Sequence, residues 1–118
     1  MKGYTLKYKV FDSSSRINLH HILFGRIIYR NSHGKKYAYY IQGMLNKTPF
    51  IRIMNSVIFV LNLENINLEE LRIFADITVK ETEREINIES MKTGEQYWRD
   101  ISIEKELPFH IKKRNVKY

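Results

Sequence analysis

The chain of 118 residues has room for one domain, because folding at this size buries only about two thirds of the surface that the unfolded chain exposes. Hydrophobic residues make up 43% of the sequence and charged residues 28%, a balance that is typical of globular proteins and excludes a disordered chain. Cysteine is absent, which excludes disulfide bonds, thiolate zinc sites and cysteine nucleophiles.

The net charge of +7 is distributed in three blocks. The first 52 residues hold ten Lys and Arg against one acid, residues 53–106 hold six against twelve, and residues 107–118 hold four basic residues and no acid. Such a distribution indicates either a basic face that meets a polyanion or pairing between oppositely charged parts of one fold.

Targeting signals are not evident in the sequence. The first ten residues alternate between polar and apolar without the apolar core of a signal peptide, and no later run is long enough to span a membrane. We therefore expect a cytoplasmic protein that does not contact a membrane.

In chain order, the first expected strand covers residues 4–10, where apolar and polar side chains alternate. The serine-rich residues 12–16 are expected to form a loop. A nearly continuous apolar run then predicts a central strand over residues 22–30, in which Gly25 marks a bulge or the close approach of another backbone segment.

Two hairpins are expected next. A turn cluster at residues 31–35, with Gly34 available for a positive φ, leads to a returning strand over residues 36–42. After a loop, the sequence predicts a tighter hairpin with strands at residues 50–54 and 57–61.

The acidic middle of the chain has two interpretations. Asn67 and Glu70 have the spacing of a capping box, which predicts one short helical turn. Alternation then predicts a charged hairpin with strands at residues 73–80 and 84–90. A helix over residues 68–80 is the alternative, but the density of β-branched residues favours a strand.

The end of the chain is expected to contain one more strand, over residues 96–103, followed by basic residues. The sequence as a whole predicts a mostly β protein with about seven short strands and at most one short helix. We expect a small barrel or a two-layer antiparallel sheet, with a single β-rich domain over residues 1–109 and a basic C-terminal tail over residues 110–118.

The strongest candidate site is the hairpin over residues 26–42, where basic residues and tyrosines gather. Cations neutralise phosphates, and tyrosine rings stack on bases. Because strand side chains alternate, Tyr37 and Tyr39 share one face while Lys36 and Tyr40 share the other, so only part of the cluster can meet one ligand. The alternative is that the tyrosines pack in the core and the lysines are ordinary turn residues.

Basic residues outside the hairpin extend this candidate site. We include one arginine of the following hairpin and the basic residues of the expected tail. The candidate nucleic-acid-binding residues are Arg26, Arg30, His33, Lys35, Lys36, Tyr37, Tyr39, Tyr40, Arg52, Lys112, Lys113 and Arg114.

The run from Lys36 to Ile41 resembles the aromatic ribonucleoprotein motif of RNA-recognition domains over six residues. It lacks the glycine that follows the first basic residue in that motif, and the expected elements include neither of the two helices that such a domain requires. We therefore assign no family and keep only the physics of base stacking.

Catalytic and metal-binding patterns are weaker. The adjacent His20 and His21 would point to opposite faces of a strand and cannot easily ligate one ion. Asp76, Glu85 and Glu89 fall in a densely charged hairpin without a catalytic motif. We expect no metal, no cofactor and no enzymatic activity, with a nuclease as the minor alternative.

The sequence thus predicts a non-enzymatic accessory protein that binds RNA or single-stranded DNA, with RNA favoured, as a small component of a ribonucleoprotein or nucleic-acid-processing complex. The sequence does not predict an oligomeric state. The main alternative is a protein-interaction adaptor, viral or defence-related among others, whose basic half meets an acidic partner or whose acidic residues 81–89 form a docking edge. Nucleic-acid binding requires the basic hairpin and the C-terminal segment to share one surface on which tyrosines are accessible.

Overall fold

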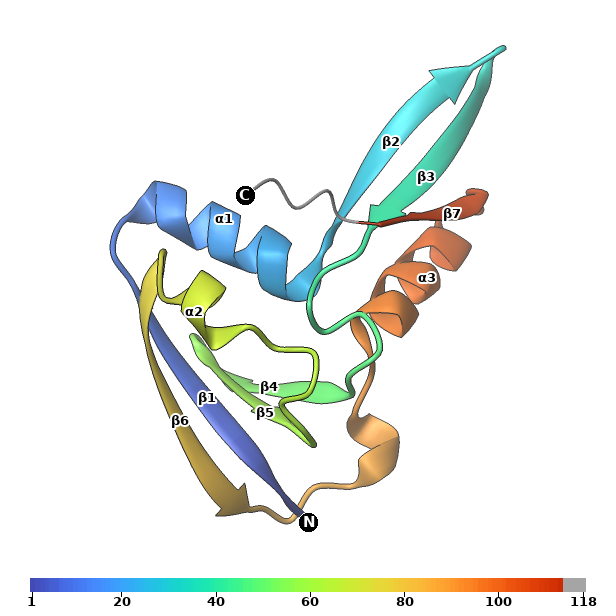
Figure 1. The fold of residues 1–118 in the computed structure, drawn as a ribbon. Helices are drawn as coiled ribbons and strands as arrows, with labels where there is room; N and C mark the ends of the chain where they lie inside the picture. The colour runs from blue at the N-terminus through green and yellow to red at the C-terminus, as the bar shows by residue number, and fades with distance from the viewer. Residues whose placement is uncertain (114–118) are drawn as a thin grey trace.

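The structure, a computed structural model, describes residues 1–113. Over these residues the chain forms seven strands in two separate sheets and three α-helices (Figure 1). The strand order is β4-β5-β1-β6 in the larger sheet and β2-β3-β7 in the smaller one. The protein is therefore mostly β with the expected number of strands. The expectation of a barrel was wrong, because neither sheet closes on itself.

The four-stranded sheet is antiparallel throughout. Its strands are β1 (Lys2–Val10), β4 (Phe50–Met54), β5 (Val57–Val60) and β6 (Ala75–Glu83). Strand β1 is central and pairs with β5 on one side and β6 on the other, so that β6 is an edge strand.

Two of the charge blocks meet in this sheet. The register of β1 and β6 places Lys2 opposite Glu83 and Lys9 opposite Asp76. Opposite charges in directly facing positions of neighbouring strands stabilise a sheet. Part of the uneven charge distribution is therefore matched within the fold.

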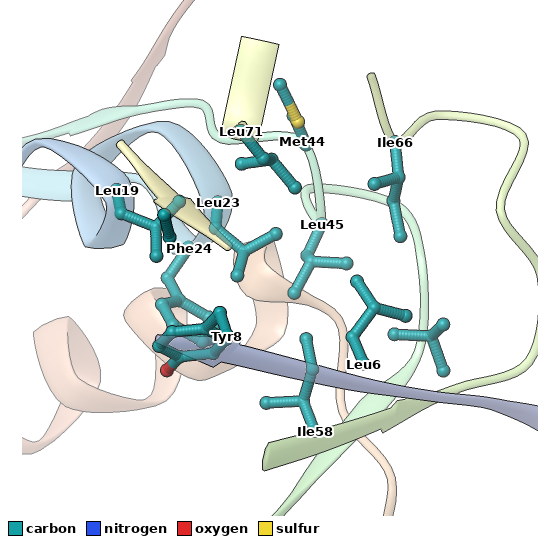
Figure 2. Close-up of a cluster of buried hydrophobic side chains, with 12 residues drawn as sticks. Leu6, Tyr8, Leu19, Leu23, Phe24, Met44, Leu45, Ile58, Ile66 and Leu71 are labelled. Carbon is teal, nitrogen blue, oxygen red and sulfur yellow. The ribbon is translucent and has the colours of Figure 1, made fainter. Parts of the chain in front are cut away.

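Helix α1 (Ser13–Phe24) supplies much of the hydrophobic core. Leu19 and Leu23 lie one turn apart on the same side of the helix and are almost completely buried. Figure 2 shows them on one side of a cluster that also contains Leu6 of β1, Ile58 of β5 and the loop residue Leu45. Complete burial of one such side chain contributes about 1.5–3 kcal/mol, so this packing holds α1 on the four-stranded sheet.

The expected loop at residues 12–16 and the strand start at residue 22 were wrong. Asp12 caps α1, since its Oδ1 accepts a hydrogen bond from the backbone N–H of Ser15 at 2.7 Å. The apolar run belongs to two elements, because its first part is the last turn of α1 and its second part lies in β2 (Arg26–Ser32). Only Gly25 and Arg26 separate the two parts, so in the sequence they look like one strand.

Gly25, between α1 and β2, marks a close approach of two backbone segments, as expected. Its φ is 79°, and a Cβ atom there would lie 2.5 Å from the carbonyl oxygen of Ile41. A Cβ atom on Gly43 would lie 2.3 Å from the backbone nitrogen of Gly25. The chain thus enters β2 and leaves β3 (Lys35–Ile41) through a single crossing.

The hairpin of β2 and β3 confirms the expected turn. His33 and Gly34 have φ values of 50° and 78°, and the positive φ at both central residues is characteristic of a type I′ turn. The hairpin projects from the rest of the molecule, with its tip at the upper right of Figure 1.

A tail that begins at residue 110 was a wrong expectation. Residues 109–112 form β7 (Phe109–Lys112), which pairs in parallel with β3. The edge of β3 leaves backbone donors and acceptors unpaired, and β7 satisfies them. Arg114 and the four residues after it lie outside the described residues.

The acidic middle partly follows the expectations. The hairpin of β4 and β5 is present, and α2 (Leu68–Leu71) begins at the cap formed by Asn67. Strand β6 confirms the β interpretation over the helical one. Its expected partner at residues 84–90 was wrong, because β6 pairs with β1 and Ile88–Ser90 form a 3₁₀ turn.

The strand expected at residues 96–103 is a helix, α3 (Gly94–Glu104), so the limit of one short helix was also wrong. Thr93 and Gln96 form a complete capping box, in which each side chain accepts a hydrogen bond from the other residue's backbone N–H. Gly94 and Ser102 are buried on the side of the helix that also carries Trp98. This side of α3 packs toward β3 and β7.

We predict that Gly43→Ala lowers the free energy of unfolding by about 3 kcal/mol, because the added methyl group meets a backbone atom that cannot move independently. Gly34→Ala is the matched control. Nothing lies within 4 Å of its added Cβ, so only the positive φ opposes it, at about 1 kcal/mol. Urea denaturation measures both values. If Gly43→Ala is as stable as the unaltered protein, the backbones of Gly25 and Gly43 do not approach each other as closely as described.

Candidate nucleic-acid interface

The two faces of the three-stranded sheet have different environments. One face packs toward α3 and carries Ala38 and Tyr40, both with no exposed surface. The ring of Phe109 in β7 stacks on Tyr40 at a centroid distance of 5.9 Å, and the Arg99 guanidinium of α3 lies 4.8 Å from the Phe109 centroid. The middle of this face is therefore part of the protein interior.

The other face of the sheet, here called the open face, has no helix packed across it within residues 1–113. Residues directly opposite each other in a sheet share a face, so the register of the three strands defines its members. The members are Arg26, Ile28, Arg30 and Ser32 of β2, Lys35, Tyr37, Tyr39 and Ile41 of β3, and His110 and Lys112 of β7.

Aromatic rings form a row across the open face. Tyr39 and His110 are stacked with centroids 5.2 Å apart and an interplanar angle of 26°. Tyr37 lies 5.9 Å from the same histidine ring. The ammonium group of Lys112 lies 4.6 Å from the Tyr39 centroid, a cation–π contact. Three rings and one cation therefore lie next to one another on one surface.

Six of the twelve candidate residues lie on the open face, and the others are placed differently. The six are Arg26, Arg30, Lys35, Tyr37, Tyr39 and Lys112. His33 is exposed in the turn, and Lys113 follows β7 beside a hollow of about 370 Å³ between α1 and the base of the sheet. Arg114 is outside the described residues.

Lys36 and Tyr40 lie on the face toward α3. Tyr40 has no exposed surface, and this burial raises the pKa of its hydroxyl to about 12. The Lys36 ammonium lies 5.0 Å from the centroid of Tyr29, whose hydroxyl accepts a hydrogen bond from Lys105 at 2.7 Å. The structure therefore confirms that Tyr37 and Tyr39 lie on one face of the hairpin and Lys36 and Tyr40 on the other.

Arg52 is not on the sheet with the hairpin. It lies on β4 at a cleft of about 660 Å³, bounded by the end of α1, the start of β2, β4 and α3. Arg26 lines this cleft too, so the cleft adjoins the open face. The other aromatic and basic side chains that line the cleft are His20, His21, Phe24, Phe50, Lys92, Tyr97 and Trp98.

His20 and His21 both line the cleft, because neighbouring residues on a helix point about a quarter turn apart. The expectation that they face opposite ways rested on a strand and was wrong. Across residues 1–113, no three His, Asp or Glu side chains are close enough to hold a metal ion together. Burial, and then Arg52, lowers the pKa of His20, while burial and then Arg26 lowers that of His21.

Sequence reasoning missed His110 as a member of the open face and the aromatic residues of the cleft. The alternation of Phe109 and Ile111 with His110 and Lys112 was an available signal for a strand. The Thr93 and Gln96 spacing was an available signal for α3, which presents Tyr97 and Trp98 to the cleft.

Comparisons with known proteins do not assign the chain to a group. No family model, no curated protein and no solved structure matches it. The helices α1 and α3 remove one of the two differences from RNA-recognition domains noted above. The missing glycine is still a difference, and two separate sheets are not the single four-stranded sheet of such a domain. None of the described helices is long and apolar enough to cross a bilayer.

We predict that folding stability decreases as the pH falls below 6.5, the ordinary pKa of histidine, because His20 and His21 take up protons less readily in the folded than in the unfolded chain. Around His20, the Tyr8 hydroxyl lies 3.3 Å from Nε2, and Arg16, His21 and Arg52 add positive potential.

Melting temperatures at about pH 7 and pH 5.5 measure this loss. In His20→Gln the loss should be smaller, whereas it should be unchanged in His33→Gln, a variant in the exposed turn. If His20→Gln and the unaltered protein lose the same amount of stability between these pH values, His20 does not contribute to the pH dependence and the prediction is wrong.

Proposed function

We propose that the protein binds single-stranded nucleic acid on the open face, as a non-enzymatic accessory component of a ribonucleoprotein or nucleic-acid-processing complex. RNA is the favoured ligand. The observation that carries the proposal is the row of Tyr37, Tyr39 and His110 flanked by cations on an uncovered sheet face.

Base stacking is the first contribution. Each base stacked on an aromatic side chain is worth about 1–3 kcal/mol and requires no particular sequence. Tyr37 and Tyr39 are half-buried, so their rings are fixed by the sheet while part of each ring stays accessible. The ammonium group of Lys112 lies over the Tyr39 ring. When this lysine turns toward a phosphate, it exposes the ring surface on which a base can stack.

Electrostatic attraction is the second contribution. Arg26, Arg30, Lys35 and Lys112 place four cations on the open face, and none of its members is Asp or Glu. Phosphate contacts release bound counterions, so affinity should fall steeply with salt. Phosphate contacts also carry no sequence information, which implies weak sequence preference.

A second candidate function, docking to a protein, is supported by the edge strand β6. Asp76, Glu81 and Glu83 are exposed on this strand, whose outer edge has no neighbour within the described chain. Charged edge strands avoid unwanted pairing but leave a polar surface for a chosen partner. An accessory protein needs both surfaces, one for nucleic acid and one for its complex. We place this role in the cytoplasm, which the lack of cysteine fits.

Fluorescence anisotropy with single-stranded and duplex RNA and DNA tests the nucleic-acid proposal, at salt concentrations from about 50 to 200 mM. We expect micromolar binding of single strands that weakens steeply with salt. Tyr39→Leu should weaken binding about tenfold through lost stacking. Arg30→Ala should weaken it several-fold and lower the salt slope by about one.

Lys36→Ala is the matched control, because it removes one charge from the same hairpin on the face toward α3. It should change binding much less than Arg30→Ala. Equal effects of the two variants would place the ligand elsewhere. An absence of binding at the lowest salt concentration would refute the proposal and leave protein docking as the favoured function.

A further inference from the structure

The cleft beside the open face gathers aromatic rings from three elements. Phe24 ends α1, Phe50 begins β4, and Tyr97 and Trp98 belong to α3. The Phe24 and Phe50 rings are 5.3 Å apart, and the Tyr97 and Trp98 rings are 5.1 Å apart. The volume of about 660 Å³ lies within the range of roughly 300–1,000 Å³ that is usual for small-molecule sites.

Three Lys or Arg side chains line the cleft, and two of them, Arg26 and Arg52, have no acidic partner among residues 1–113. The Arg52 guanidinium lies 5.0 Å from the Phe24 centroid, and Arg26 is exposed at the start of β2. Neither forms an ion pair with a carboxylate of residues 1–113, and no Asp or Glu lines the cleft. Lys92 differs, since its ammonium is held 2.7 Å from Asp100. Arginine matches phosphate through paired hydrogen bonds, so this surface suits an anionic group.

The start of α3 also borders the cleft, but its backbone donors are already used. The N–H of Gly94 donates to Leu45, that of Glu95 to Asn46, and that of Gln96 to the Thr93 hydroxyl. These three donors are therefore not free for an anion in the cleft, whereas the guanidinium groups of Arg26 and Arg52 are donors there without a carboxylate partner among residues 1–113.

Trp98 is fixed at the cleft by a specific contact. Its Nε1–H donates a hydrogen bond of 3.1 Å to the carbonyl oxygen of Phe24 at the end of α1. A flat ring held in this way costs little conformational entropy when a ligand packs on it.

We propose that this cleft binds a nucleotide, with the base among the aromatic rings and the phosphate at Arg26 and Arg52. A planar heteroaromatic group next to a phosphate matches both features of the cleft, whereas an acidic peptide uses the arginines and leaves the rings uncovered. The nucleotide is either free or the end of a strand. Apart from Arg26, the cleft shares no residue with the open face, so this site does not rest on the function proposed above.

Trp98 gives a direct readout, because it is the only tryptophan of the sequence and it lines the cleft. Its emission is followed while AMP, GMP, CMP or UMP is added to the full chain. We expect a saturable change with at least one of the four, and a much weaker response to adenosine or to inorganic phosphate, each of which supplies half of the ligand.

Arg52→Gln tests the phosphate contact, and we expect it to weaken nucleotide binding about tenfold or more. Arg52→Lys keeps the charge without the guanidinium geometry and should give an intermediate loss. Arg30→Gln is the matched control on the open face and should leave the Trp98 response unchanged. Both positions are exposed, and circular dichroism checks that the variants are folded.

Short oligonucleotides with and without a 5′-phosphate distinguish the two sources. If the 5′-phosphorylated strand changes the Trp98 emission at concentrations well below those that the mononucleotides require, the ligand is the end of a strand. If both require the same concentration, the ligand is a free nucleotide. Emission that no nucleotide or strand changes would overturn the proposal. A response that persists in Arg52→Gln, or one that an oligo-aspartate peptide reproduces through Arg52, would overturn it as well.

Discussion

The backbones of Gly25 and Gly43 cross so closely that neither position has room for a side chain. At this crossing the chain leaves α1 for the projecting hairpin and returns from the hairpin to the core. Two hydrogen bonds next to it join the loop to the helix, donated by Met44 and Leu45 to the carbonyls of Ile22 and Leu23. The same loop buries Leu45 against Leu23 in the core of Figure 2. The direction of the hairpin is thus set by the core.

The proposed binding surfaces follow from this constraint. Because the crossing fixes the start of β2, it places Arg26 between the open face and the cleft. Strand β7 then adds residues from near the other end of the sequence and brings His110 and Lys112 beside Tyr39. In the larger sheet the basic β1 lies against the acidic β6. On the open face of the smaller sheet, by contrast, the four cations have no acidic residue beside them in the strand register.

The sequence alone predicted the elements whose signals are local. The turn at His33 and Gly34, the hairpin of β4 and β5 and the cap at Asn67 depend on a few adjacent residues. The pairings of β6 with β1 and of β7 with β3 depend on contacts between distant parts of the chain, which no local pattern specifies. α1 was hidden by an apolar run that extends from Ile22 into β2 with only Gly25 and Arg26 as an interruption. α3 has a complete capping box, but Tyr97, Ile101 and Ile103 would share one face of a strand, and this alternation favoured a strand.

The candidate site was predictable to a similar extent. Alternation alone separated Tyr39 from Tyr40, and the first is on the open face while the second is fully buried. Arg52 was grouped with the hairpin on charge, although its neighbours in space are Phe24 and the cleft. A site made by the end of one helix, the start of another and two strands from different sheets has no signature along the chain.

The most direct test of the account is to map the ligand on the protein by following backbone amide resonances in NMR spectra while a short single strand is added. The account predicts that the largest shifts lie along β2, β3 and β7, around Arg30, Tyr39 and His110, with a smaller group at the cleft. Shifts confined to β1 and β6, or an unchanged hairpin with saturating ligand, would contradict it.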